Sequence, residues 1–291
     1  MNPPSAPPDN PRFTTSLATL SGIEDRGPNY ARMTFRLERP SDFRTVGVAP
    51  RLKVFLPRQR GMIPNLPGTD DDGFRRSTES TCPIVRTYTL RAHRPERHEV
   101  DIDFVIHPSG FAGQWAAQPC CGDVIGLSNG LGSEPFPTVD DILLVGDLSA
   151  VPAITTVVEA LPSTTTVRVL ITADGPHELI LLDPSIAPHT EWVFEHVRTA
   201  TAPVLVSVVR RSISQRLPDH VWAAGEASQI KQIRTLVRDE LAFPAHRVHA
   251  AGYWRRDTTS ETFESEIVGE VRFALAQNPD LTARQIDDLS I

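Results

Sequence analysis

The amino-acid sequence predicts two different domains in tandem: an antiparallel β-barrel, then a doubly wound parallel α/β domain with a C-terminal helical tail. The 291 residues are enough for about two domains. Short segments of alternating polar and apolar residues fill the first half, whereas nearly continuous apolar strands alternate with helices in the second. We therefore expect a barrel domain at 13–136, an α/β domain at 137–256 and a helical tail at 257–291.

The barrel domain is predicted from short strands that glycine and proline residues separate. The expected strands are 31–37, 51–55, 84–91, 99–107 and one that begins at Asp123. A short helix is expected at 113–118, and a long loop is expected at 58–82. Loops of that length usually serve a site or are disordered. The pattern indicates a small antiparallel barrel with one inserted helix.

The second domain is predicted from strands and helices that alternate after Pro137. The expected strands are 141–146, 166–173, 202–210 and 220–224, and the expected helices are 152–161 and 226–241. Ligands bind outside the carboxyl ends of such parallel strands, so segments 146–152 and 225–228 are candidates for a site. A Gly-x-Gly-x-x-Gly fingerprint does not occur in this half. A nucleotide site there must therefore be argued from other residues.

Composition and charge argue against nucleic-acid binding, a membrane span and secretion. The net charge of -7 argues against non-specific nucleic-acid binding. No apolar run approaches the roughly 18 residues that indicate a membrane span, and the proline-rich residues 1–12 lack the pattern of a secretion signal. We expect a soluble, cytoplasmic protein that binds neither nucleic acid nor a membrane.

The three cysteines predict neither a disulfide framework nor a zinc site. Cys120 and Cys121 are adjacent, and a bond between them would need a strained ring. We expect reduced thiols that pack as small buried residues.

The most informative motif is Arg-Thr-Tyr-Thr-Leu-Arg at 86–91. On a β-strand, residues two apart share a face, so Arg86 and Tyr88 can reach a phosphate and a ring system together. If Thr89 ends the strand, its hydroxyl or backbone can approach the ring from the turn. This chemistry is typical of flavin binding, but the hexamer alone also suits any half-exposed strand with good β propensity.

Ordered sequence blocks resemble those of the siderophore-interacting proteins, and the resemblance covers roughly residues 15–256. A barrel before an open parallel sheet is also the arrangement of the ferredoxin-reductase superfamily. The matching blocks are Arg86-x-Tyr88-Thr89-x-Arg91, Asp103-Phe104-Val105-Ile106-His107, Gly110-Phe111-Ala112-Gly113-Gln114-Trp115-Ala116, Gly122-Asp123, 144–154, Ala224-Gly225-Glu226-Ala227-Ser228 and Gly252-Tyr253-Trp254-Arg255.

The resemblance implies a ferric-siderophore reductase that binds FAD and takes electrons from NADH or NADPH. It implies that Arg86 pairs with the FAD pyrophosphate, that Tyr88 lies against the isoalloxazine and that Thr89 bonds near its reactive nitrogen. His107 would meet the phosphates or the ribityl chain, and helix N–H groups at 113–116 would face the pyrophosphate. The other residues implied at the cofactors are Asp103, Ala112, Gly113, Gln114, Trp115, Ala116, Asp147, Ser149, Ala150, Pro152, Glu226, Tyr253 and Trp254.

Several of these residues have a structural alternative. Trp115 is as well explained by packing as by flavin contact. Pro152 suits the first turn of a helix, and Glu226 places a favourable charge near a helix N-terminus. Tyr253 and Trp254 could cover the flavin or the ribose, or belong to the core.

The sequence also departs from the family pattern. Gly113 stands where the family commonly has Ser, which removes one phosphate donor, and Cys121 replaces a usual Pro. Asp257 begins an acidic tail with a helix expected at 260–277. The acids of that tail are Glu261, Glu264, Glu266, Glu270, Asp287 and Asp288. In relatives this region borders the siderophore pocket, so the substrate can differ.

Ferric siderophores are often anionic, so arginines are the candidate substrate-binding residues. These candidates are Arg255 and Arg256, with Arg75 and Arg76 as further ones. Asp174, just after the second parallel strand, would repel a 2′-phosphate and favours NADH, whereas Lys231 favours NADPH. No metal site and no catalytic acid or base is predicted.

Two other functions stay open at the level of sequence. One is a flavin-dependent reductase of another acceptor, such as a quinone, free flavin or a ferredoxin-type partner, and a ferredoxin-type electron donor is a further candidate partner. The other is a non-catalytic binding protein that kept the scaffold but lost productive FAD contacts.

Overall fold

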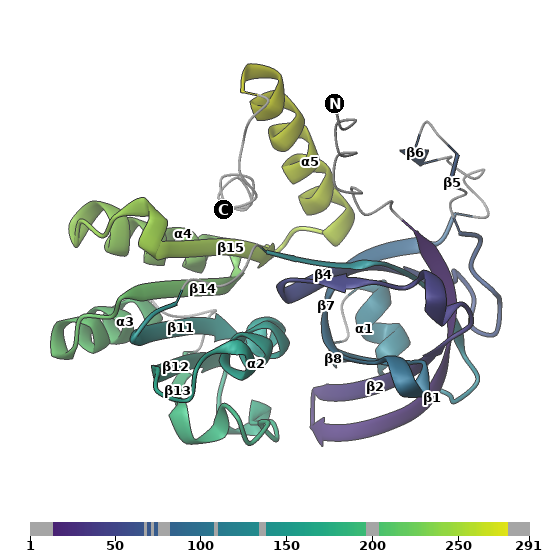
Figure 1. Cartoon of the computed structure of the whole chain (residues 1–291), viewed down its shortest axis with the longest axis horizontal. Helices are drawn as coiled ribbons and strands as arrows, with labels where there is room; N and C mark the ends of the chain where they lie inside the picture. The colour runs from purple at the N-terminus through teal and green to yellow at the C-terminus, as the bar shows by residue number, and fades with distance from the viewer. Residues whose placement is uncertain are drawn as a thin grey trace, which may run out of the picture.

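The computed structural model describes residues 14–66, 69–70, 73–74, 82–107, 110–133, 138–195 and 204–278. Figure 1 shows a barrel formed by the N-terminal half beside a parallel sheet with helices formed by the C-terminal half. The predicted boundary at 136/137, residues 67–68, 71–72 and 75–81 of the predicted loop at 58–82, and the tail after 278 lie outside the described residues. The predicted domain bounds therefore stay predictions.

The N-terminal domain is a closed antiparallel barrel, as predicted. Around the ring the strands are β4 (Val48–Leu56), β7 (Ile84–Arg94), β8 (Glu99–Val105), β2 (Tyr30–Leu37), β1 (Thr15–Gly27) and β9 (Val124–Ser128), and β9 pairs with β4. Short strands β3 (Thr45–Val46) and β10 (Gly130–Ser133) extend the sheet beside β4, and β5 (Thr69–Asp70) pairs with β6 (Gly73–Phe74). Alternate residues such as Met33, Phe35, Ile102 and Phe104 are fully buried and fill the barrel.

Helix α1 (Phe111–Ala116) packs its buried residues against the barrel core. It begins two residues earlier than predicted, and the centroid of the Trp115 ring lies 5.9 Å from that of Phe104. Strand β7 begins at Ile84 as predicted and runs three residues beyond the predicted end at 91, to Arg94, so Thr89 does not end the strand. An irregularity in its pairing with β8, between Leu90 and Ala92, lets the chain bend without leaving the sheet.

The C-terminal domain is a five-stranded parallel sheet with helices on both faces, which confirms the doubly wound prediction. Its order is β13 (Thr190–Phe194), β12 (Thr166–Ala173), β11 (Asp141–Asp147), β14 (His220–Glu226) and β15 (Val248–Trp254). Leu143 and Val145 pack into the core on one face, and Ile142 and Leu144 pack into the core on the other. The strand order reverses at β11, so the carboxyl ends of β11 and β14 flank the crevice where such sheets bind ligands.

The helices of this half are α2 (Val151–Ala160), α3 (Val204–Gln215), α4 (Ala227–Thr235) with a π-helical turn at Leu236–Glu240, and α5 (Ser260–Gln277). The bounds of α5 match the prediction. The predicted strand at 202–210 is wrong, because α3 begins at Val204. Leu205, Val208, Val209 and Ile213 are buried at helical spacing and form its apolar stripe.

The two domains are joined by a docked loop and an ion-pair network. The backbone N–H of Leu181 donates to the carbonyl of Arg26 at 2.6 Å, and the Arg26 guanidinium donates back to the Leu181 carbonyl. The Asp183 carboxylate forms ion pairs with Arg26, Arg32 and Arg91 of the barrel, at 3.2, 2.8 and 3.1 Å. Three cations from the barrel therefore meet one carboxylate from the α/β domain.

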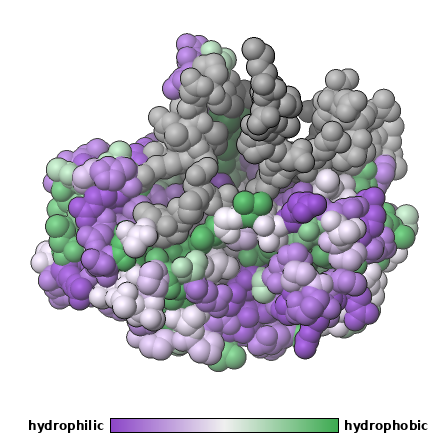
Figure 2. Space-filling model, in the orientation of Figure 1, coloured by the Kyte–Doolittle hydropathy of each residue, from purple (hydrophilic) through white to green (hydrophobic). Residues whose placement is uncertain are grey.

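Two surface findings bear on the sequence analysis. Cys120 and Cys121 are exposed and Cys82 is half-buried, so the expectation of small buried residues is wrong. The pair lies in a surface turn that the Asp123 N–H closes by donating to the Cys120 carbonyl. Figure 2 shows hydrophilic residues spread over both domains, with hydrophobic residues in smaller patches. Within the described ranges, no helix is both long and apolar enough to cross a membrane.

Candidate functional site

Tyr88 is held on a rigid aromatic support inside the barrel end. Its ring centroid lies 4.5 Å from that of Phe104, which in turn contacts Trp115. Burial raises the pKa of the Tyr88 phenol, and the nearby Arg86 cation only partly opposes this. Tyr88 is thus a neutral, fixed aromatic side chain, and such a side chain suits stacking rather than proton transfer.

Arg86 and Thr89 lie on the same strand as Tyr88. Arg86 is half-buried, and its Nη1 donates to the Val85 carbonyl at 2.7 Å. Thr89 is buried and faces Arg51 across the β4–β7 pair. The structure therefore keeps the cation and the aromatic ring on one face of β7. The contacts of Arg86, Tyr88 and Thr89 with a flavin stay predictions.

A pocket of about 620 Å³ opens beside α1. Its lining residues are Asn29, Arg58, Arg60, Ile106, His107, Phe111, Gln114, Trp115, Ala117 and Gln118. Arg60 donates to Asp123 at 2.5 Å and to the Trp115 carbonyl at 2.7 Å, and its guanidinium lies 5.5 Å from the Trp115 ring centroid. Guanidinium, imidazole and amide donors around one opening form a donor set that fits a diphosphate.

Sequence reasoning missed Arg58 and Arg60 because both stand at the start of a segment interpreted as a flexible loop. A signal was present for Arg60, since its partner Asp123 belongs to the matched Gly122-Asp123 block. Among the predicted residues, His107, Gln114 and Trp115 line the pocket, whereas Ala112 and Ala116 are buried in α1.

Position 113 requires a glycine because the backbone of His107 passes directly against it. A Cβ at Gly113 would collide with the backbone carbonyl oxygen of His107. A serine at this position would need the His107 backbone to move. The glycine is therefore matched to the path of this chain.

Asp103 lies at the junction between the domains. Its carboxylate accepts from Arg32 Nε at 2.7 Å, from Arg32 Nη2 at 2.8 Å and from the Tyr30 hydroxyl at 3.2 Å. It is not among the residues that line the pocket beside α1. Its contact with a cofactor stays a prediction, and its observed role is to hold Arg32, which also reaches Asp183.

The second half of the site is built around Asp147 at the carboxyl end of β11. One carboxylate oxygen accepts from the Ser149 backbone N–H at 2.8 Å and from the Ser149 hydroxyl at 2.5 Å. The other accepts from the Glu226 N–H at 2.9 Å and from the Trp254 indole N–H at 2.8 Å. Burial raises the pKa of Asp147, although these hydrogen bonds oppose the rise. One carboxylate therefore joins the ends of β11, β14 and β15.

Gly225 makes room for this carboxylate. Its φ of 147° lies outside the range that L side chains readily adopt, and a Cβ there would lie 2.6 Å from Asp147 Oδ2. The Ala-Gly-Glu block of the sequence thus has a steric reason: the backbone of β14 must pass directly against Asp147.

Several of the predicted cofactor residues have the packing or capping role that the sequence analysis gave as the alternative to cofactor binding. Glu226 caps α4, since its carboxylate accepts from the Gln229 N–H at 2.9 Å, and it is only 3% exposed. Pro152 lies in the first turn of α2, and Ala150 is fully buried. Tyr253 packs against the core on the α2 face. The nicotinamide contacts expected of these residues stay predictions.

Helix α5 brings carboxylates to the barrel and to β15. Glu264 accepts from Lys53 Nζ at 3.3 Å and from the Thr87 hydroxyl at 2.9 Å. Glu266 pairs with Arg255 at 2.6 Å. The backbone N–H of Arg256 donates to Glu226 at 3.3 Å. Two further arginine candidates, 75 and 76, lie outside the described residues.

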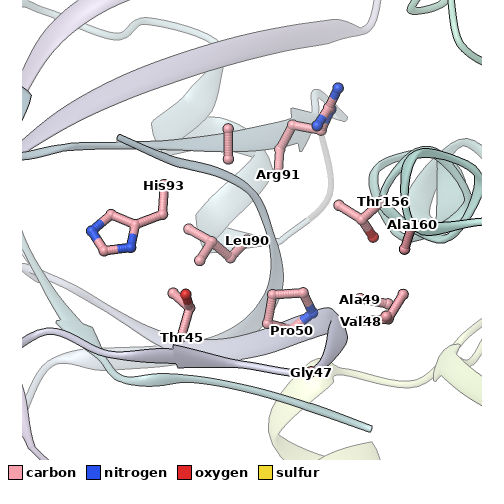
Figure 3. A pocket seen from close by; sticks show the side chains of 11 residues that line it. Thr45, Gly47, Val48, Ala49, Pro50, Leu90, Arg91, His93, Thr156 and Ala160 are labelled. Carbon is pink, nitrogen blue, oxygen red and sulfur yellow. The ribbon is translucent and has the colours of Figure 1, made fainter. Parts of the chain in front are cut away.

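A second pocket, of about 270 Å³, lies between β4, β7 and α2 (Figure 3). His93 lines it, and its Nε2 is buried without a hydrogen-bond partner, so burial lowers the pKa of the imidazole. None of the predicted cofactor residues lines this pocket.

Comparisons with known proteins agree with this division into two domains. The profile described as "Siderophore-interacting FAD-binding domain" matches residues 19–133, and the profile described as "Siderophore-interacting protein" matches residues 139–257. Ferric vibriobactin reductase ViuB of Vibrio cholerae is 28% identical over 218 residues, which cover 74% of this chain and 80% of ViuB. An uncharacterized protein of Mycobacterium tuberculosis is 34% identical over 204 residues, which cover 66% of this chain and 72% of that protein.

Solved structures support the same conclusion. A siderophore utilization protein from T. fusca has a TM-score of 0.72 and 26% identity, and the match covers 85% of this chain and 95% of that chain. Phthalate dioxygenase reductase has a TM-score of 0.59 and 14% identity over 86% of this chain and 70% of that chain, a likeness that shows the fold alone. With a barrel that matches the FAD-binding profile, an α/β domain that matches the second profile and relatives along most of its length, the chain belongs to the siderophore-interacting protein family.

Proposed function

We propose that this protein is a ferric-siderophore reductase that uses FAD to carry electrons from NADH or NADPH to siderophore-bound Fe(III). The observation that carries the proposal is Tyr88 on its Phe104 and Trp115 support, beside a pocket rich in cationic and amide donors. ViuB, a relative along 80% of its length, is named a ferric vibriobactin reductase.

The described residues fit FAD. We propose that Tyr88 supports the ring system, while Arg58, His107 and Gln114 donate to the diphosphate and Arg86 adds positive charge. FAD, when bound, accepts two electrons from a nicotinamide and releases them one at a time. The protein supplies position, a dry aromatic support and electrostatics. None of these tasks requires a side chain to transfer a proton.

The proposed reaction is balanced without an additional reactant. One NADH or NADPH supplies two electrons, reduces two Fe(III) to two Fe(II) and releases one proton. Hard oxygen donors hold Fe(II) less tightly than Fe(III), so reduction frees the iron from the siderophore. Because the reductant is a pyridine nucleotide, we place the protein in the cytoplasm.

We propose that the nicotinamide binds at the carboxyl ends of β11 and β14. Doubly wound sheets bind ligands in this crevice. Asp147 lies at its edge and accepts hydrogen bonds from Ser149, Glu226 and Trp254. Asp174 follows β12, where a carboxylate would repel a 2′-phosphate, and this favours NADH.

The proposal is tested by the absorbance of the purified protein. A flavin spectrum should bleach on anaerobic addition of NADH, and a ferric siderophore should restore it while a ferrous chelator detects Fe(II). Substituting Arg86→Ala together with Tyr88→Ala should yield a colourless protein. Tyr88→Phe, which keeps the aromatic face, and Arg97→Ala, at an exposed residue, should both stay yellow.

The same experiment separates the alternatives. A wild-type protein that stays colourless when FAD is added would overturn the proposal in favour of a binding protein. A protein that is bleached and then reoxidised by a quinone, free flavin or a ferredoxin, but by no ferric siderophore, is a reductase of another acceptor.

A further inference from the structure

Arg60 lies where three segments of the barrel domain meet. It follows β4 in the chain, and its guanidinium reaches both the end of α1 and the surface turn at 120–123. Its Nη1 donates to the Asp123 carboxylate at 2.5 Å, and its Nη2 donates to the Trp115 carbonyl at 2.7 Å. The guanidinium also lies 5.5 Å from the centroid of the Trp115 ring. One side chain therefore joins the loop after β4 to α1 and to that turn.

Asp123 is itself held in place, so it gives Arg60 a fixed partner. Its side chain is only 9% exposed, and the oxygen that pairs with Arg60 also accepts from the Cys120 N–H at 3.1 Å. The Asp123 backbone N–H donates to the Cys120 carbonyl, and the Asp123 carbonyl accepts from the Leu20 N–H of β1. A charged hydrogen bond to a shielded carboxylate fixes geometry better than an exposed ion pair does. The barrel therefore sets the position of the Arg60 guanidinium.

The Trp115 ring depends on Arg60 because its own polar atom does not hold it. Trp115 is 5% exposed, and its indole Nε1 is buried without a hydrogen-bond partner among the described residues. The ring instead contacts the Arg60 guanidinium and Phe104, whose ring centroid lies 5.9 Å away. Phe104 in turn supports Tyr88. A displacement of Arg60 would therefore reach the aromatic support that we propose for the flavin.

Arg58 lines the same pocket as Arg60 but differs from it in charge compensation. Its Nε donates to the Cys82 carbonyl at 2.8 Å, and no carboxylate within the described ranges pairs with it. The charge of Arg60, by contrast, is offset by Asp123. An anion is attracted most strongly by charge that is not offset locally. Arg58 is therefore suited to bind a phosphate, whereas the contacts of Arg60 suit it to hold protein segments together.

We infer that Arg60 is a positioning residue of the flavin site, which holds α1 and Trp115 in place, and is not a ligand of the cofactor phosphates. The inference rests on the proposed function, because it requires that FAD binds in the barrel domain. Both ends of the guanidinium are needed, one for the Asp123 carboxylate and one for the Trp115 carbonyl. A lysine brings the same charge but no planar fork, so it cannot hold both partners in one geometry. For a phosphate ligand, lysine would be a good substitute.

The first test uses the partner of Arg60. Asp123 is not among the residues that line the pocket, so Asp123→Asn removes no contact with a ligand there. If Arg60 positions α1, weakening its anchor should lower the affinity for FAD about fivefold. If Arg60 instead binds phosphate, removing the neighbouring negative charge should raise that affinity. The sign of the change therefore separates the two roles.

The second test changes the two arginines. Arg60→Lys keeps the charge and should nevertheless weaken FAD binding about fivefold, at high salt as well as at low salt. Arg58→Ala should also weaken FAD binding, but this loss should shrink as salt screens the phosphate charge. Arg97→Ala, at an exposed residue, is the control and should match the wild type.

Affinities are measured by the quenching of flavin fluorescence on the whole chain after its flavin has been removed. Visible circular dichroism of the bound FAD reports on the aromatic support, so it should change in Asp123→Asn and Arg60→Lys and stay unchanged in Arg58→Ala. Urea unfolding shows whether each variant is folded under these conditions. If Arg60→Lys does not fold, Asp123→Asn decides.

The inference is overturned if Asp123→Asn binds FAD as tightly as the wild type or more tightly, or if Arg60→Lys keeps the wild-type affinity. Failure of the proposed function would look different. A wild type that binds no FAD contradicts both proposals. If the wild type binds FAD and reduces a ferric siderophore, but the variants show the opposite signs, only the role given to Arg60 fails.

Discussion

Asp147 is the residue on which the strand ends of the α/β domain converge. Its two carboxylate oxygens accept from four donors, contributed by Ser149, Glu226 and Trp254. Two of these N–H and O–H donors point at each oxygen, so both terminal atoms of the side chain at this position must be hydrogen-bond acceptors. An aspartate supplies two acceptor oxygens, and no other side chain of this length does so.

We predict that Asp147→Asn lowers the free energy of unfolding by about 1–3 kcal/mol, because its amide NH₂ must face at least one buried donor pair. It should also shift the fluorescence of Trp254, whose indole N–H loses or changes its partner. Denaturant unfolding and emission spectra measure the two effects. Asp140→Asn, at an exposed residue just before β11, is the matched control. Equal stability of the two variants would contradict the role given to Asp147.

The sequence identified Asp147, Glu226 and Trp254 as candidates, but not the bonds between them. Those bonds depend on the register of β11, β14 and β15, which places residues 79 and 107 positions apart within 3 Å. Composition and spacing do not encode that register. By contrast, Arg86 and Tyr88 share a face because of strand periodicity alone, and this could be predicted.

Among the elements, α3 shows why a local pattern can mislead. The run Val-Leu-Val-Ser-Val-Val at 204–209 favours a strand by β propensity, yet it forms the first half of a helix. The deciding signal lies beyond the run, where Ser212 and Ile213 complete a buried stripe at helical spacing. Short apolar runs cannot be assigned from periodicity alone, so the tertiary packing decided the element.

Helix α5 was predicted with its observed bounds, because its N-cap and first-turn acids give a clear start. The Thr259 side chain accepts from the Thr262 N–H and caps the helix. What the sequence did not reveal is that Glu264 and Glu266 pair with Lys53 and Arg255, since those contacts depend on where α5 packs.

At the level of this element, we predict that Gly269→Ala stabilises α5 by about 0.5–1 kcal/mol, because an Ala costs less chain entropy in a helix interior. A Cβ at Gly269 meets nothing within 4 Å, so no steric cost opposes the gain. Slower amide hydrogen exchange across α5 measures it. Gly61→Ala is the control, since it also has open space but has a φ of 79° and should be destabilised. Unchanged exchange in α5 would contradict the prediction.

At the scale of the whole molecule, the junction between the domains is held by charge and by one docked loop. Asp183 is 8% exposed and meets Arg26, Arg32 and Arg91, while Asp103 holds Arg32 from the other side. Buried charges require such mutual compensation. The tandem of two domains could be predicted from the change in pattern after Pro137. The ion-pair network around Asp183 could not be predicted in this way, because its partners lie as far as 157 residues apart in the chain.

The three barrel arginines also make the stability of the protein depend on acid pH. They lower the pKa of Asp183 to about 2, from an ordinary value of 3.8. A carboxyl group whose pKa is lower in the folded state stabilises the fold above its unfolded pKa and loses that contribution as the pH falls through its folded pKa. The contribution of Asp183 is therefore complete above about pH 5, amounts to about 2 kcal/mol, and is lost progressively between about pH 5 and 1.

We predict that Asp183→Asn lowers the free energy of unfolding at neutral pH by about 3 kcal/mol, because it leaves a cluster of buried guanidinium groups undercompensated. It should also flatten the pH dependence of stability between about pH 5 and 1, since the titrating group is gone. Urea unfolding at a series of pH values measures both effects. Glu24→Gln is the control: Glu24 also pairs with Arg26, but it is 52% exposed and should contribute less than 1 kcal/mol. If the wild type and Asp183→Asn lose stability in parallel below about pH 5, the acid sensitivity belongs to other carboxylates. The junction would then not depend on the charge of Asp183.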